Sequence, residues 1–360
     1  MDTVLKTNKH NGMTVGQLVI VTFFALISIP YHGSPFLSGL DGSWSLILNY
    51  LSFSDFKFGS DIFFTYGPLG FICAAVYRGR NFWIAHMIWI IIYLIQMVTV
   101  VKIIRKKNNN IYILASFLMM YAIGFPRGGD YLCYLLMLNL LLLWSGDKKA
   151  GIIASLIAVL LFFVKFSNAI FAFTTIIAFT IMTYIKEGKG TGLKPFLIIP
   201  LAIMGGYLVY NPSLFDFLNY IRGAVEISSG YTTAMSISQN DAYVIWVILI
   251  VVLYLIIGCI MYKKKRDVAL MFVWYAPGLF LLYKHGFVRA DGHVFLSFRG
   301  MFWVLSSMML YIGVEEQNDI IAQKLISGNH VNINLASRIA RGHFFRQFSA
   351  AHLLGGGAIG

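Results

Sequence analysis

Long apolar runs separated by short charged clusters dominate the chain. A bilayer core about 30 Å thick needs roughly 20 helical residues, and uncharged runs near this length recur along the sequence. Clusters of Lys and Arg lie between many of these runs. The pattern predicts an all-α, polytopic integral membrane protein with about ten transmembrane helices, at 14–32, 82–101, 111–125, 131–144, 150–164, 169–185, 195–210, 242–262, 268–283 and 294–312.

Two apolar stretches are ambiguous, and the alternation of charge decides between their interpretations. Residues 62–77 are apolar enough to cross, but a crossing there would move the cations of 102–107 to the other side. A dipping or surface-lying element is therefore predicted. Residues 150–185 contain one charge and have cations on both flanks, which favours a tight helical hairpin turning at 165–168. A re-entrant hairpin satisfies the same parity and is the alternative.

Composition narrows the class of protein. The chain has 360 residues, of which 58% are hydrophobic and only 12% charged, whereas soluble domains carry roughly 25% charged residues. A soluble enzyme is therefore excluded. The three cysteines are scattered in apolar segments, which excludes a disulfide framework. The formal net charge of +13 does not indicate nucleic acid, because the cations lie at the ends of apolar runs instead of on one basic face.

The distribution of cations orients the chain. With the N-terminus in the cytoplasm, 19 of the 28 Lys and Arg residues fall in cytoplasmic segments and 8 outside, in agreement with the positive-inside rule. We expect a bacterial or archaeal plasma membrane, both termini cytoplasmic, one membrane domain over 1–312 and a cytoplasmic tail over 313–360. The outside segments hold 8 of the 15 acids, which points to a site on that face.

The first outside loop, residues 31–81, carries the most structured motif. Four apolar residues recur at helical spacing and predict an amphipathic interfacial helix over 42–53: Trp44, Ile47, Leu48 and Leu51. Asp41 precedes this helix and is expected to cap it. Further along, Asp61 and Tyr66 belong to a ten-residue segment of aromatics with a Gly-Pro break, typical of a pocket lining. Both are assigned to substrate binding.

The opening motif Asp41-Gly-Ser-Trp44, followed by Tyr66-Gly-Pro-Leu69, resembles the GT-C superfamily of membrane glycosyltransferases. The resemblance covers the N-terminal hundred residues best and implies a polyprenyl-phosphate-linked sugar and membrane lipids as partners. It implies that Asp41 is the catalytic base that deprotonates the acceptor hydroxyl. The chain departs from the family pattern at Gly42, where many relatives carry a second acid, and no large extracytoplasmic C-terminal domain follows.

Two other outside loops carry polar clusters. Residues 125–131 offer Arg127, two glycines and Asp130, a set suited to a phosphate and a hydroxyl. A Gly-rich turn closed by an Arg127–Asp130 ion pair is the alternative. Residues 284–293 form the densest polar cluster, and its cations Lys284 and Arg289 are expected to bind the donor phosphate together with Arg127.

The remaining polar residues of this region are assigned to substrate binding: His285, Asp291, His293 and Arg299. Arg299 is a lone charge in the last span, where charges usually face a cavity, although snorkelling to the interface would also explain it. Lys165, at the hairpin tip, ranks behind it. No metal ligand is assigned, because Asp-x-His is too short to specify a metal, and a divalent cation is left open. Residues 211–241, with Tyr231, are interpreted as a loop that serves as a lid or only as a connection.

These features predict a membrane glycosyltransferase acting at the extracytoplasmic face. The alternative is a multi-pass transporter or flippase for a lipid-linked or anionic substrate, built with discontinuous helices. A polymerase or ligase of surface polysaccharide differs from the first chiefly in its acceptor. Polar clusters on one face, instead of near the midplane of several spans, favour the enzyme.

Overall fold

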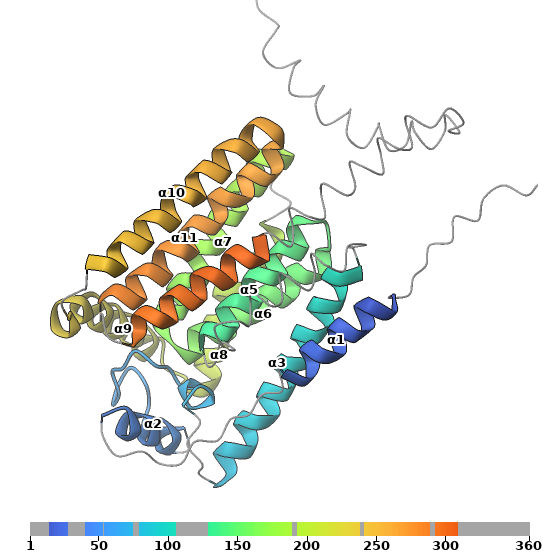
Figure 1. The fold of residues 1–360 in the computed structure, drawn as a ribbon. Helices are drawn as coiled ribbons and strands as arrows, with labels where there is room; N and C mark the ends of the chain where they lie inside the picture. The colour runs from blue at the N-terminus through green and yellow to red at the C-terminus, as the bar shows by residue number, and fades with distance from the viewer. Residues whose placement is uncertain are drawn as a thin grey trace, which may run out of the picture. The chain divides into compact units, whose positions relative to one another are not determined.

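The structure, a computed structural model, describes residues 14–27, 40–52, 54–74, 79–105, 129–188, 193–237, 241–288 and 292–308. Within these residues the fold is helical, with only isolated β-bridges (Figure 1). The α-helices are α1 Val15–Ile27, α2 Leu40–Leu51, α3 Gly79–Arg105, α5 Gly129–Trp144, α6 Lys148–Val164, α7 Phe166–Glu187, α8 Ile199–Tyr210, α9 Leu214–Met235, α10 Asp241–Lys264 and α11 Arg266–Val288. Another helix covers 293–308, and short 3-10 helices lie at Gly70–Ile72 and Lys194–Phe196.

Every predicted span except 111–125, which lies outside the described residues, overlaps one of these helices. Four helices are long and apolar enough to cross a membrane alone: Gly79–Ile103, Phe166–Glu187, Ala242–Lys264 and Arg266–Val288. A fifth candidate is the pair Lys194–Tyr210 and Leu214–Tyr231, bent by 112°. The described part of the chain is thus all-α with four or five candidate spans. The count of ten stays a prediction, and the tail over 313–360 lies outside the described residues.

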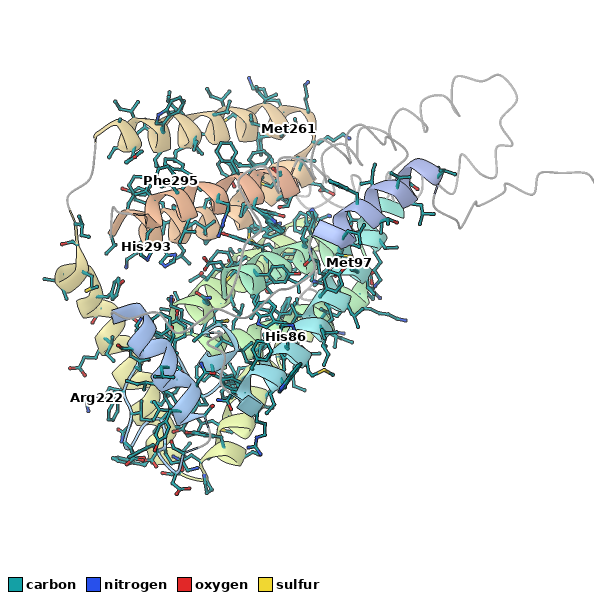
Figure 2. The ribbon with its side chains drawn as sticks, turned by 60° about the horizontal axis from the view of Figure 1, so that its bottom comes forward. His86, Met97, Arg222, Met261, His293 and Phe295 are labelled. Carbon is teal, nitrogen blue, oxygen red and sulfur yellow. The ribbon has the colours of Figure 1, made fainter. Side chains whose placement is uncertain are left out.

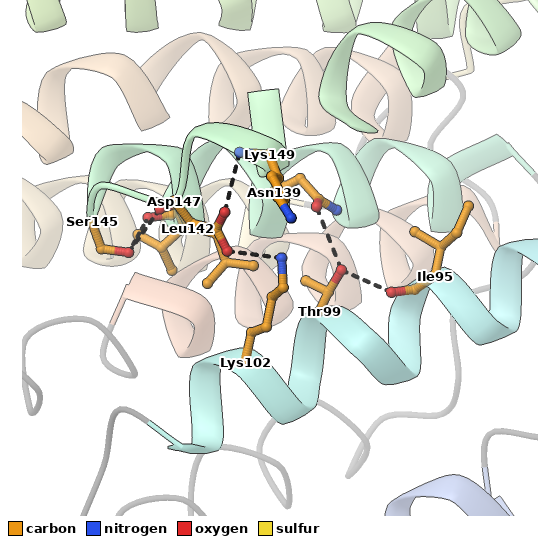
Figure 3. A network of polar contacts seen from close by, with 9 residues as sticks. Ile95, Thr99, Lys102, Asn139, Leu142, Ser145, Asp147 and Lys149 are labelled. Atoms are coloured by element: carbon orange, nitrogen blue, oxygen red, sulfur yellow. Dashed lines mark hydrogen bonds and ion pairs between the residues drawn. The ribbon is translucent and has the colours of Figure 1, made fainter. Parts of the chain in front are cut away.

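Polar contacts join several helices at one end, which we call the Lys186 end. Lys102 of α3 forms an ion pair of 2.8 Å with Asp147, in the turn between α5 and α6 (Figure 3). Lys186, near the C-terminus of α7, lies 3.5 Å from the Asp267 carboxylate of α11 and 4.1 Å from the centre of the Trp144 ring. The segments gathered here are ones that the sequence assigns to the cytoplasm.

Helices α6 and α7 form a hairpin with a turn of one residue. Lys165 has an extended backbone, with φ −157° and ψ 128°, so it ends α6 and precedes α7. The α6 helix has 17 residues, and at a rise of about 1.5 Å per residue Lys165 lies roughly 25 Å from the Lys186 end. We call its surroundings the Lys165 end. The hairpin occurs where the sequence predicts it, although its turn is shorter than 165–168.

Helix α2, inside the first loop, and helix α9, which packs on this loop, differ from their predictions. The α2 helix begins at Leu40, so Asp41 lies in its first turn instead of at the N-cap, where an acid is still favoured by the helix dipole. The interpretation of 211–241 as a loop is wrong, because α9 occupies most of it. Ser213 caps α9 by accepting a hydrogen bond from the Asp216 amide at 3.2 Å. The described part of 62–77 contains only the three-residue helix Gly70–Ile72, whose residues are buried, and the dipping or surface-lying element stays a prediction.

Candidate functional site

The break at Lys165 leaves helix ends that need hydrogen-bond partners. The last carbonyls of α6 find no donor inside their own helix, and the first amides of α7 find no acceptor inside theirs. Residues 65–69 of the first loop supply three hydrogen bonds to them: from the Phe166 amide to the Thr65 carbonyl at 2.8 Å, from the Gly67 amide to the Val164 carbonyl at 3.2 Å, and from the Leu69 amide to the Phe163 carbonyl at 2.9 Å. The aromatic Tyr-Gly-Pro-Leu motif therefore pairs with the hairpin break in an antiparallel, strand-like manner.

Gly67 is the point at which the two backbones approach most closely. A Cβ atom at this position would lie 2.5 Å from the Phe163 carbonyl oxygen and 2.5 Å from the Tyr220 hydroxyl. Neither distance accommodates a side chain. The glycine of the motif is therefore required by the close approach of the loop to α6.

This pairing brings the Tyr66 side chain to Lys165. The Lys165 Nζ lies 4.9 Å from the centre of the Tyr66 ring, and the two side chains interact electrostatically. Trp44 of α2 stacks on the same ring, with centroids 4.9 Å apart and planes inclined by 23°. A cation beside two stacked aromatic rings is held in one place, because the ring faces attract it and restrict its rotamers. The first loop thus positions the charge at the hairpin tip.

Asp130 lies in the first turn of α5, within electrostatic range of Tyr66, Lys165 and His285. It forms no ion pair with Lys165 within 4.0 Å in the part of the chain that the structure describes. The neighbouring Gly129 packs against α7, since a Cβ there would lie 2.0 Å from the Asn168 Nδ2. An acid and a base thus face the same region without neutralising each other directly.

Two histidines complete the group. The His285 and His293 rings lie 5.9 Å apart in an edge-to-face arrangement, with His285 near the end of α11 and His293 at the start of the next helix. In Figure 2, His293 lies far from Met261, which is near the C-terminal end of α10. Five residues, which we call the Lys165 cluster, therefore meet at the Lys165 end, and all are half-buried: Tyr66, Asp130, Lys165, His285 and His293.

Arg299 adjoins the Lys165 cluster through Tyr134 of α5, which lies within electrostatic range of both Arg299 and Asp130. The Arg299 side chain is half-buried, and its Nε is buried with no hydrogen-bond acceptor among the described residues. Of the two predicted orientations, this position agrees with one facing the interior of the helices. A guanidinium with an unused donor there is suited to an anionic ligand.

Protonation states follow from the surroundings of the groups outside the candidate spans. Burial alone lowers the pKa of the Lys165 ammonium, but Tyr66 and Asp130 outweigh it and raise this pKa above its usual value. Burial raises the pKa of the Tyr66 phenol, against the opposing effect of Lys165. Lys165 is therefore a cation, and Tyr66 a neutral phenol, at any physiological pH.

The other predicted site residues lie elsewhere or beyond the described part. Asp61 is exposed and accepts a hydrogen bond from the Lys57 amide at 2.8 Å within its own turn. Lys284 is exposed. The backbone of Asp41 lies one helical turn before Trp44, and its side chain is outside the described set, as are three whole residues: Arg127, Arg289 and Asp291.

Sequence reasoning underrated Lys165 and missed Asn168. The signal for Lys165 was present, because it is the only charge within 150–185. Asn168 follows it by three residues and is only 7% exposed, with no hydrogen-bond acceptor for its Nδ2 among the described residues. A polar residue one turn after a lone intramembrane lysine is a pattern that can be sought.

Within the described residues no group of three or more His, Cys, Asp or Glu side chains is arranged to hold a metal ion. No model of a known protein family, no curated protein and no solved structure matches the chain.

Proposed function

We propose that the protein is a membrane glycosyltransferase that transfers a sugar from a polyprenyl-phosphate-linked donor to an acceptor at the Lys165 end. The observation that carries the proposal is the convergence of the Lys165 cluster from four separate segments of the chain. The cluster offers a cation for a phosphate, and an acid and two histidines for sugar hydroxyls. Charged and polar groups gathered at one end of apolar helices suit a substrate whose lipid chain stays in the membrane.

Asp41 is the proposed catalytic base. It lies three residues before Trp44 on α2, and residues three apart share a helix face, about 4.5 Å apart along the axis. Trp44 in turn stacks on Tyr66 of the Lys165 cluster. In the reaction, the acceptor oxygen bonds to the anomeric carbon while its proton passes to Asp41. The bond from that carbon to the phosphate oxygen breaks, and the electron pair leaves with the lipid phosphate.

Transport of a lipid-linked substrate is the second candidate. Two features favour it: the one-residue break between α6 and α7, and the 112° bend between the helices α8 and α9. Broken helices of this kind form substrate sites in transporters. The position of the cluster at helix ends, instead of at mid-helix, favours the enzyme.

Reconstituted protein distinguishes the two candidates. Proteoliposomes would carry a panel of radiolabelled polyprenyl-phosphate hexoses, with cell-envelope extract as the source of acceptor. We expect label to move from the lipid into a new glycoside. The Asp41→Asn substitution should lower the rate of this transfer about 10²-fold or more without unfolding the protein. Asp55→Asn, which changes an exposed acid of the same loop, is the matched control. Movement of intact donor across the bilayer, with no new glycoside, would identify a transporter.

A further inference from the structure

The hairpin break is followed by a buried hydrogen-bond donor that has no acceptor among the described residues. Among the described residues the buried Asn168 Nδ2 has no acceptor, and the Lys165 ammonium interacts electrostatically with the Tyr66 side chain. Buried donors are normally satisfied, so an unused one in a cluster marks a place where a ligand supplies the acceptor. The ligand that matches such a site carries acceptors and no donors.

The start of α7 adds a fixed positive potential at the same place. This helix has 22 residues, and the N-terminus of a helix carries a partial positive charge with its first amides directed outward. Three of those amides are already used, by Thr65 and Lys165 carbonyls, whereas the Ser167 amide has no backbone acceptor among the described residues. Lys165 stands directly before this helix, so a full charge and the helix dipole act in the same direction.

Asp130, the acid whose described side chain acts electrostatically on Lys165, leaves the positive charge available. Asp130 is not ion-paired with Lys165 among the described residues, and it lies in the first turn of α5, where that helix dipole stabilises it. The cation therefore lacks the carboxylate that a buried lysine normally needs. A half-buried, aromatic-clamped lysine without a carboxylate at contact distance is a site for an exogenous anion.

We propose that Lys165, the Asn168 Nδ2 and the N-terminus of α7 form a phosphate site. Tyr66 is a positioning residue, which acts by holding Lys165. The proposal rests on the proposed function only in assigning the phosphate to the lipid-linked donor. In that reaction the site stabilises the negative charge that accumulates on the departing phosphate. Free phosphate has the same chemistry, and the test separates the two sources.

Binding is measured with radiolabelled decaprenyl phosphate and protein in nanodiscs of zwitterionic phosphatidylcholine, with uncharged decaprenol as the comparison lipid. We expect Lys165→Gln to weaken binding of the phosphate lipid at least tenfold, and Lys165→Arg to restore most of it. Asn168→Asp, which replaces the donor by a negative charge, should weaken binding to a similar degree. Arg222→Gln, which removes an exposed cation of α9, should leave it unchanged.

Tyr66→Phe separates positioning from structure. It keeps the ring that stacks on Trp44 but removes the hydroxyl, so we expect weaker phosphate binding with an unchanged melting temperature. In a separate measurement, inorganic phosphate is added as a competitor of decaprenyl phosphate. Competition at millimolar concentration assigns the site to phosphate of either source, and its absence, with tight lipid binding, assigns it to the lipid headgroup.

The site is overturned if folded Lys165→Gln and Asn168→Asp bind decaprenyl phosphate as the unchanged chain does, or if decaprenol binds equally well. Its failure is distinguishable from failure of the proposed function. Phosphate binding that depends on Lys165, in a protein that forms no glycoside, supports the site and refutes the transferase. Sugar transfer that persists in Lys165→Gln refutes the site alone.

Discussion

Replacing Gly67 by alanine tests whether the first loop is fastened to the hairpin break. The new Cβ would lie 2.5 Å from the Phe163 carbonyl oxygen, whereas ordinary carbon–oxygen contacts begin near ~3.3 Å. The loop and α6 must therefore separate by about 0.8 Å. A separation of this size breaks the Gly67–Val164 hydrogen bond, already 3.2 Å long, and strains the two beside it. At ~0.5–1.5 kcal/mol per net hydrogen bond, the loss of all three bonds costs about 2–4 kcal/mol.

Hydrogen exchange followed by mass spectrometry measures this loss. A loss of ~2 kcal/mol corresponds to about thirtyfold faster exchange of the amides that open with the loop. We expect this acceleration in peptides covering 62–74 and 163–170, and not in α10. Gly205→Ala is the matched control, because a Cβ there meets nothing within 4 Å and alanine favours the α8 helix by up to ~1 kcal/mol.

Equal exchange in Gly67→Ala and Gly205→Ala would refute the argument that the loop holds Lys165 in place. The same comparison bears on activity. If the loop is released while the helices stay folded, the variant should lose sugar transfer and phosphate binding together, because Tyr66 no longer reaches Lys165.

Two further experiments test residues at opposite ends of the helices: maleimide labelling of Cys73 and substitution of Lys186. Burial, assisted by Asp130 and opposed by Lys165, raises the pKa of the Cys73 thiol to about 12, so its thiolate fraction at pH 8 is about a thousandfold below that of a free cysteine. With the other two cysteines replaced by alanine, maleimide should label Cys73 correspondingly slowly in the folded protein and rapidly in detergent-denatured protein. Fast labelling of both forms would contradict the burial of the Cys73 thiol. At the Lys186 end, Lys186→Met removes the contacts to Asp267 and Trp144 and should lower the free energy of unfolding by about 1–2 kcal/mol. The control Lys149→Met, at an exposed position, should not lower it. Equal melting temperatures of the two variants would show that the contacts of Lys186 contribute nothing to stability.

The helices were predictable where their apolar runs are continuous, because burial in lipid or in the core imposes the same sequence pattern. The α9 helix was not recognised, since Gly223, Gly230 and several polar residues interrupt its apolar character. Its buried residues nevertheless recur at helical spacing: Phe217, Tyr220 and Ala224. That narrow stripe packs on the first loop, where Tyr220 meets Phe58 edge to face at 6.2 Å. Tertiary packing, more than local propensity, therefore determines this helix.

The candidate site was partly predictable for a similar reason. Tyr66, Asp130, His285 and His293 could be chosen from their positions in polar loops, because polar groups at the ends of apolar helices have few purely structural uses. The pairing of Tyr66 with Lys165 could not be foreseen, because the two residues are far apart in the sequence and no local pattern specifies a long-range pairing. The sequence around Asn168 is that of an ordinary helix, and only the lack of an acceptor for its Nδ2 among the described residues distinguishes it.

The pairing of the first loop with the hairpin break also constrains the order in which the site is assembled during synthesis. Residues 65–69 leave the ribosome long before 163–166, so the loop must wait, without its hydrogen-bond partners, until α6 and α7 have been made and inserted. His285 and His293 follow later still. A nascent chain that ends before α7 therefore cannot form the Lys165 cluster, and any catalytic or binding activity appears only once the second half of the protein is in the membrane.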